Sequence, residues 1–214
     1  MHHARQHAQN RTRERRRRLA YEAARLMAEG GIRDFHQAKL KAADRLGIHD
    51  DASLPRNREI EEALREYQRI FLGPTQEQAL RTRRQAALRA MEFFAGFEPR
   101  LVGPVLEGTA DTSSPVQLHL YADDGDAVTR FLVEHDIPAQ PRQRRLRLDR
   151  ERSLDATVWL FSAEELAFEL VVLPMQALRQ APLSAVDERP MRRASSSQLR
   201  ELLAREHAAL PAFG

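Results

Sequence analysis

Small residues between two apolar runs suggest a phosphate-binding turn in the middle of the chain. The stretch 101–124 reads LVGPVLEGTADTSSPVQLHLYADD, an apolar run followed by Gly108-Thr109, a polar loop and an alternating run at 116–121. This pattern predicts a strand, a small-residue turn and a second strand. Glycine and small hydroxyl residues let backbone N–H groups approach phosphate oxygens closely. We therefore expect Gly108 and Thr109 to bind a nucleotide phosphate.

Polar residues alternate with apolar ones on the strand that follows this turn. Gln117, His119 and Tyr121 share one face of it, because side chains two apart in a strand point the same way. His119 has two interpretations, a ligand for a metal or phosphate and a buried polar residue with satisfied hydrogen bonds. Asp123 and Asp124 end the strand, and they either cap the next helix or bind a metal.

Glu169 lies in the apolar run 168–172, where a carboxylate requires a partner. Arg145 and Arg147, on one face of a strand predicted at 142–148, can supply it. Glu169 is therefore either an active-site residue or half of an ion pair. The two arginines are also candidates to clamp a phosphate through their planar donor forks, or else they form an exposed sheet face.

The order of elements in the second half resembles the nucleotidyltransferase superfamily. The elements concerned are the helix before Gly96, the strand into Gly108, the loop with Ser114 and the strands at 116–121 and 168–173. The minimal members of that superfamily are the most similar in layout. In that family a glycine followed by a small residue binds the triphosphate, and a Ser-Asp-x-Asp element on the next strand holds two metal ions. A third carboxylate comes from a later strand.

The resemblance is incomplete at the metal-binding positions. Ser114 matches the serine of the family's element and Glu169 its third carboxylate, but Pro115 and Gln117 stand where the two aspartates belong. Carboxylates at i and i+2 of a strand can share divalent cations that bridge phosphates, and two neutral side chains cannot. The resemblance thus implies a protein that binds a nucleotide or a nucleic-acid end, with metal-dependent transfer weak or lost. Its cofactor would be Mg²⁺ with a nucleoside triphosphate, and no residue is assigned as a metal ligand.

The helical first half, followed by LVGPVLEGTA, LHLYAD and FELVVLP, is also similar to a family of bacterial proteins with this kind of second half. That similarity implies a fold and no particular activity. The catalytic candidates are Glu169, Gln117 and His119, and the nucleotide-binding candidates are Gly108, Thr109, Ser114, Arg145 and Arg147.

The remaining sequence indicates how these residues are positioned. Apolar residues recur at helical spacing in the first half, which predicts helices at about 12–29, 34–47, 60–71 and 75–96. From Phe97 the pattern changes to short or alternating runs, which predict strands at 101–106, 116–121, 142–148, 157–161 and 168–173. Asp123-Asp124 is expected to cap one helix and Ser195–Gln198 to open the last.

The fold class that follows is α+β, an N-terminal helical region followed by a nucleotidyltransferase-like mixed β-sheet with flanking helices. The expected domains are a basic, flexible arm at 1–18, a helical domain at 19–74 and the α+β domain at 75–214.

Positive charge is concentrated in the arm. Residues 1–18 contain seven arginines against Glu14 alone, about +6, and residues 19–214 carry about −3. Such a block is typical of a solvated tail, and it can also bind nucleic acid by releasing counterions, although the run has no interleaved aromatic residue for base stacking. The alternative function is therefore a nucleic-acid-binding adaptor that uses the helical half and the arm, with contacts from Arg11, Arg13, Arg15, Arg16, Arg17 and Arg18.

The amino-acid composition and the missing motifs exclude several kinds of chemistry and a membrane location. The chain has no cysteine, which excludes disulfides, thiolate catalysis and cysteine-ligated zinc. No window approaches the roughly 18 consecutive apolar residues of a membrane span, and no apolar signal-peptide region follows the basic N-terminus, so we expect a cytoplasmic protein. The P-loop, dinucleotide-binding, zinc-protease and serine-hydrolase motifs are missing.

Overall fold

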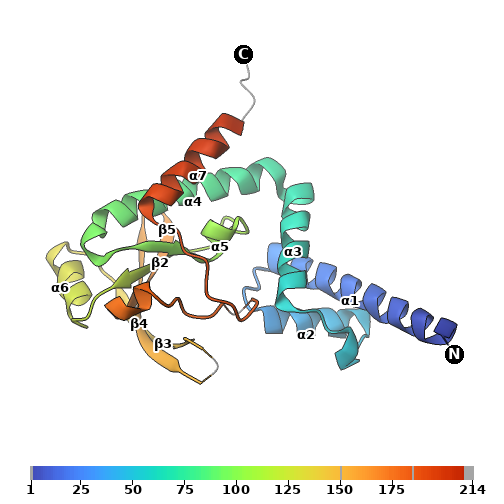
Figure 1. The fold of residues 1–214 in the computed structure, drawn as a ribbon. Coiled ribbons are helices and arrows are strands. Elements are labelled where there is room, and N and C mark those ends of the chain that lie inside the picture. Colours follow the sequence, from blue (N-terminus) through green and yellow to red (C-terminus); the bar gives the residue numbers. More distant parts are fainter. Residues whose placement is uncertain (1, 150, 185, 210–214) are drawn as a thin grey trace, which may run out of the picture. The chain divides into compact units, whose positions relative to one another are not determined.

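The computed structural model describes residues 2–149, 151–184 and 186–209, which fold as two compact units (Figure 1). The first comprises Met1–Gln76 with Ala185–Glu188, and the second Glu77–Ser184 with Arg189–Gly214. The division at Gln76 lies close to the boundary expected after Pro74.

Within its described residues, the first unit is helical, as the sequence predicts. It contains α1 (His2–Gly30), α2 (Phe35–Leu46) and α3 (Asn57–Tyr67), with a short 3₁₀ turn, η1 (Asp51–Ser53), and a π-helical turn, η2 (Gln68–Leu72). The Asp34 carboxylate accepts a hydrogen bond from the backbone N–H of Gln37 at 2.7 Å and caps α2. Gly47 ends that helix in the left-handed conformation, with φ of 62°.

Small side chains form much of the core of the first unit. Leu19, Ala23, Ala38, Ala42 and Ile60 are completely buried, and alanine at helix contacts lets the axes approach closely. This core contains no residue before Leu19 among the described part of α1. The structure therefore differs from the expected flexible arm: residues 2–18 are the first turns of α1, and they extend past α2 and α3 (Figure 1).

α4 (Gly73–Phe93) begins at the Gly73-Pro74 pair instead of after it. Proline is tolerated in the first turn of a helix, because the N–H that it lacks has no partner there. Gly73 and Pro74, which lie between the helices predicted at 60–71 and 75–96, therefore open the second of these helices.

A five-stranded mixed sheet forms the centre of the second unit. Its spatial order is β1-β2-β5-β4-β3, with β2 and β5 parallel and the other neighbours antiparallel. This confirms the α+β class. The strands are β1 (Arg100–Val102), β2 (Val116–Tyr121), β3 (Gln140–Arg147), β4 (Ser153–Ala163) and β5 (Leu166–Leu173).

The two faces of the sheet differ in what covers them. On the helix-covered face, Leu118, Leu120 and Leu170 pack against α4, α6 (Ala127–Glu134) and α7 (Ser196–Ala209). On the opposite face, Tyr121 and Val171 pack against η4 (Met175–Leu178). The side chains of Gln117, His119 and Glu169 belong to this opposite face by strand alternation.

The strand predicted at 101–106 is wrong in its second half. β1 ends at Val102, and Gly103–Glu107 forms the short helix α5. Gly103 leaves the strand with φ of 71°, and Pro104 lies in the first turn of α5. A short apolar run does not distinguish a buried strand from a strand followed by a helical turn.

The two predicted helix caps of the second half have different outcomes. α6 starts after Asp126, and the Asp124 carboxylate instead accepts the N–H of Asp126 at 3.0 Å. Ser195 and Gln198 form the predicted reciprocal cap of α7, with the Ser195 N–H donating to Oε1 of Gln198 at 2.9 Å. None of the helices in the described part of the chain is both long and apolar enough to cross a bilayer.

Candidate functional site

The predicted phosphate turn is the C-terminal end of α5. Gly108 caps the helix with φ of 83°, and the backbone N–H groups of Gly108, Thr109 and Ala110 all donate to the carbonyl of Pro104 at 2.9–3.1 Å. Backbone N–H groups engaged in this way do not face a ligand. A helix C-terminus also carries partial negative charge, which repels an anion. The strand–turn–strand layout expected around Gly108-Thr109 is therefore wrong, because the turn is a helix end, and phosphate binding by these two residues stays a prediction.

Two buried arginines of α4, which sequence reasoning missed, hold this region in place. Arg84 donates from Nε to the Val105 carbonyl at 3.0 Å and from Nη2 to the Leu106 carbonyl at 3.3 Å, and it pairs with Glu206. Burial lowers the pKa of Arg84 to about 10. Arg83 donates from Nε to the Ser114 carbonyl at 2.8 Å. Adjacent arginines in an amphipathic helix give no sequence signal that they turn inward.

Ser114 organises the loop before β2. Its hydroxyl donates to Oδ1 of Asp111 at 2.8 Å and accepts the N–H of Asp111 at 3.0 Å. Burial acts to raise the pKa of Asp111, but hydrogen bonds from Ser114 and Ser113 outweigh it, and the pKa is lowered. The Ser114 hydroxyl and the Asp111 carboxylate therefore hydrogen-bond within the loop.

Gln117 and Glu169 do come together. They lie opposite each other on the parallel strands β2 and β5, and Nε2 of Gln117 donates to Oε2 of Glu169 at 3.0 Å. The same carboxylate oxygen accepts from Nη2 of Arg144 at 3.1 Å. We call Gln117, Glu169 and Arg144 the Glu169 cluster.

The arginine in the Glu169 cluster is not one of the two predicted. Arg145 alternates onto the other face of β3, opposite Asp155 of β4, and Arg147 shares that face. Arg144, on the face of Glu169, is the one that the strand alternation brings within reach. The predicted ion pair therefore forms with a different partner, and Arg145 and Arg147 do not line this cluster.

Gly103 fits closely against the Glu169 cluster. A Cβ atom at Gly103 would lie 1.9 Å from Oε1 of Gln117. A side chain at Gly103 would have to displace the amide of Gln117, and glycine adopts the φ of 71° without strain. The glycine that adjoins the candidate site is therefore Gly103, before α5, and not Gly108 after it.

His119, on β2, is buried on the same face, with 2% of its surface exposed. Burial, followed by the positive charges of Arg193 and Arg144, lowers its pKa to about 4, so the imidazole is neutral at pH 7. Among the described residues, its Nδ1 atom has no hydrogen-bond partner. Arg193 is held by the hydroxyl of Tyr121 at 2.9 Å and the carbonyl of Ala177 at 2.8 Å.

The carboxylates of the second unit do not fit a metal pair. Asp123 accepts the N–H of Met175 at 2.9 Å, Asp124 pairs with Arg130 at 2.5 Å, and Glu169 is bound as described. The described residues contain no group of three or more histidine, aspartate or glutamate side chains that could hold an ion. Among the described residues, this face thus offers no cage of three carboxylates, and binding of Mg²⁺ with a nucleoside triphosphate stays a prediction.

A separate cavity of about 470 Å³ opens beside α4 in the second unit. Its walls are mainly aromatic and small apolar residues, and the Arg89–Glu164 ion pair at 2.5 Å lies in its lining. The rings of Phe161 and Phe168 stack there, with centroids 5.1 Å apart. The predicted site residues are not among its lining.

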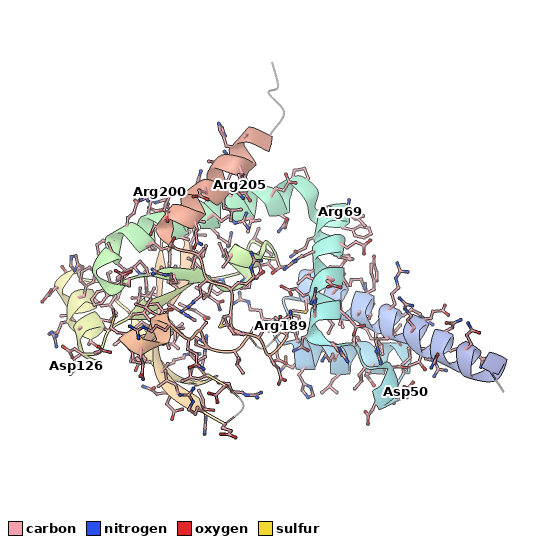
Figure 2. All side chains as sticks on the ribbon, in the orientation of Figure 1. Asp50, Arg69, Asp126, Arg189, Arg200 and Arg205 are labelled. Carbon is pink, nitrogen blue, oxygen red and sulfur yellow. The ribbon has the colours of Figure 1, made fainter. Side chains whose placement is uncertain are left out.

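The arginines of α1 divide into two groups. Arg15 pairs with Asp50, labelled in Figure 2, at 3.3 Å, and Arg16 donates to the Ala52 carbonyl, so both hold α1 against the segment before α3. The second group, Arg11, Arg13, Arg17 and Arg18, is exposed and makes no ion pair with a carboxylate of the described residues. We call these four the α1 arginines. The side chain of Arg5 lies outside the described ones.

Comparisons with protein-family models, curated proteins and solved structures gave no match. The candidate sites therefore rest on their own geometry.

Proposed function

We propose that this protein binds nucleic acid through its phosphate backbone and that the α1 arginines make the contacts. The observation that carries this proposal is that four exposed guanidinium groups, without carboxylate partners among the described residues, project from one continuous helix. The expected arm would have to be ordered on binding, whereas a helix already fixes the spacing of its charges.

The physical basis is counterion release. Each phosphate neutralised by an arginine frees a condensed cation, which favours association and makes it steeply dependent on salt. The planar guanidinium also donates two parallel hydrogen bonds to phosphate oxygens. Arg15 and Arg16 support this role indirectly, because their bonds to Asp50 and Ala52 fix the base of the charged segment.

The test replaces all four α1 arginines with glutamine and measures binding to fluorescein-labelled DNA and RNA by anisotropy over a range of salt concentrations. The plot of log affinity against log salt should lose about 3 to 4 units of slope, from 0.7–0.9 per phosphate contact. Arg69→Gln, an exposed arginine of the same unit labelled in Figure 2, is the single-charge control and should lose less than about 0.7 units of slope. A loss in the four-arginine variant no larger than that in Arg69→Gln would refute contact by α1.

A second function, nucleotide binding at the Glu169 cluster with transfer activity weak or lost, is favoured by one observation. Gly103, which directly follows β1, lies against Gln117, and Gln117 is bonded to Glu169 on the parallel neighbouring strand. In the family that the sequence resembles, the glycine lies in a turn after a strand and is followed by a small residue. Gly103 directly follows β1, which Gly108 does not, but it is followed by Pro104 and not by a small hydroxyl residue.

In this second proposal Arg144 is the phosphate contact. Its side chain is 44% exposed, and it can exchange the Glu169 carboxylate for a phosphate oxygen. Pro115 and Gln117 supply no carboxylate, so no transfer step through a metal is assigned.

Calorimetric titration with ATP, CTP, GTP and UTP, with and without magnesium, tests nucleotide binding. We expect binding that does not depend on magnesium and is lost in Arg144→Gln, but is kept in Arg145→Gln on the other face of β3. No heat with any of the four nucleotides would exclude the site. Label transfer by a Pro115→Asp/Gln117→Asp variant would show that the scaffold can still hold metal ions.

A further inference from the structure

A hollow of about 450 Å³ lies on α1 beside two of the α1 arginines. It is lined by Glu14, Arg17, Arg18, Tyr21 and Glu22 of α1 and by Leu46 of α2. All six residues belong to the first unit. Its volume is within the range of small-ligand sites, about 300–1,000 Å³.

The helical repeat creates this arrangement. Tyr21 follows Arg17 by four residues and Arg18 by three, so the three side chains are neighbours on one surface of α1. The arginine run itself contains no aromatic residue, but the next helical turn brings one beside it. Because α1 is helical through this region, the stacking platform that the run lacks is present.

Tyr21 is both anchored and accessible. Its ring contacts Tyr67 of α3 in a T-shaped arrangement, with centroids 5.7 Å apart, and Tyr21 is nevertheless 41% exposed. A tyrosine held by one neighbour while a large part of its surface meets solvent loses little conformational freedom when a flat group stacks on it.

The charges around Tyr21 favour an anionic ligand at one side. Glu22 is neutralised by Arg25 at 2.9 Å and Arg45 at 3.1 Å; these bonds, that from Arg25 above all, lower its pKa. Arg17 and Arg18 have no such partner among the described carboxylates. Glu14 is the remaining carboxylate of the hollow, and it can accept a hydrogen bond from an amino group.

We propose that this hollow binds one nucleotide of a single-stranded nucleic acid, with the phosphate on Arg17 and Arg18 and the base stacked on Tyr21. The inference rests on the proposed nucleic-acid binding and specifies its substrate class. In a duplex the faces of the bases are stacked on one another, so only an unpaired base can reach Tyr21. DNA and RNA strands share the chemistry required.

The test compares labelled single strands of DNA and RNA, about 12 nucleotides long, with a blunt duplex of the same length. Tyr21→Leu keeps an apolar contact for Tyr67 but removes the flat ring. It should weaken single-strand binding roughly 5- to 150-fold and leave duplex binding unchanged. Tyr21→Phe should bind as the unaltered protein does.

The charged half of the hollow gives a separate readout. In Arg17→Gln/Arg18→Gln the salt slope for single strands should fall by about 1.4 units, and in Arg69→Gln by less than half of that. Photo-crosslinking of bromouridine RNA to the unaltered protein should label Tyr21, which does not require any variant to fold.

The outcomes separate this inference from the function on which it depends. Suppose that the four-arginine variant loses binding, but Tyr21→Leu weakens the binding of single strands and duplex equally or changes neither. Base stacking on Tyr21 is then wrong, and binding of the phosphate backbone by α1 stands. If the four-arginine variant keeps its salt slope, nucleic-acid binding by α1 fails as well. A crosslink that maps only to other residues also overturns the inference.

Discussion

Gly103→Ala tests whether a close backbone approach really defines the Glu169 cluster. The added methyl group would lie 1.9 Å from Oε1 of Gln117, so the Gln117 side chain must move and release Glu169. A hydrogen bond to a charged group contributes about 1.5–3 kcal/mol. A non-glycine residue in the left-handed region costs roughly 1–2 kcal/mol more. The free energy of unfolding should therefore fall by roughly 3 kcal/mol.

A double-mutant cycle separates the two contributions. In a Gln117→Ala background there is no long side chain to displace, so Gly103→Ala should cost only the backbone strain, about 1 kcal/mol. The difference, a coupling free energy of about 2 kcal/mol, belongs to the displaced hydrogen bond. Gly125, whose Cβ would meet nothing within 4 Å, is the matched control, and Gly125→Ala should change stability by less than about 0.5 kcal/mol.

Urea unfolding followed by the fluorescence of Trp159, the only tryptophan, is the assay. Trp159 lies on β4 and packs against the core of the second unit, so its signal reports the unit that contains Gly103. If Gly103→Ala costs the same in the Gln117→Ala background as in the unaltered protein, the cycle shows no coupling. The close contact would then not be what fixes Gln117, and the second proposal would lose its main support.

Three further changes test the packing around the candidate sites. The pKa of His119 is about 4 in the folded protein and 6.5 in the unfolded chain, so the unfolded chain binds more protons between these values. The free energy of unfolding should therefore fall by roughly 3 kcal/mol as the pH is lowered from about 6.5 to 4. His119→Leu should remove this pH dependence in urea titrations. Arg84→Met should cost about 3 kcal/mol in thermal unfolding, because it leaves the carbonyls of Val105 and Leu106 and the Glu206 carboxylate without this donor. Arg81→Met, at a half-buried arginine that loses only its bond to His207, should cost less in the same assay. Ser195→Ala should cost about 1 kcal/mol by removing the cap of α7, and a loss near zero in chemical denaturation would show that Gln198 alone suffices.

The predictions that succeeded depend on local patterns. Asp34 and Gly47 bound α2, and Ser195 caps α7, because caps are satisfied by atoms within a few residues. The alternating run at 116–121 forms β2, since side chains two apart in a strand share a face: Leu118 and Leu120 lie on one face, and His119 and Tyr121 on the other. Such signals are complete within one segment of sequence.

The predictions that failed depend on which hydrogen-bond partners the polar groups of a segment have in the folded protein. The run from Leu101 is apolar throughout, and only the packed unit shows that Gly103 turns the chain into α5. The N–H groups at Gly108 and Thr109 are used by Pro104, four and five residues earlier, so a small-residue turn became a helix end. The small residues in the sequence show that the backbone could approach a phosphate. They do not show that its N–H groups already donate to a carbonyl of the same chain.

The sequence by itself determined the α+β class, the faces of β2 and β5 and the charge of the N-terminal segment, because periodicity and charge are properties of the chain. Tertiary structure alone decided that Arg144, and not Arg145 or Arg147, meets Glu169, since the pairing of β3 with β4 and of β4 with β5 sets which residues of β3 share a sheet face with Glu169. It also decided that Gly103 adjoins Gln117 and that Arg83 and Arg84 point inward. These contacts join residues far apart in the chain, and a local sequence pattern does not predict which distant residues come into contact.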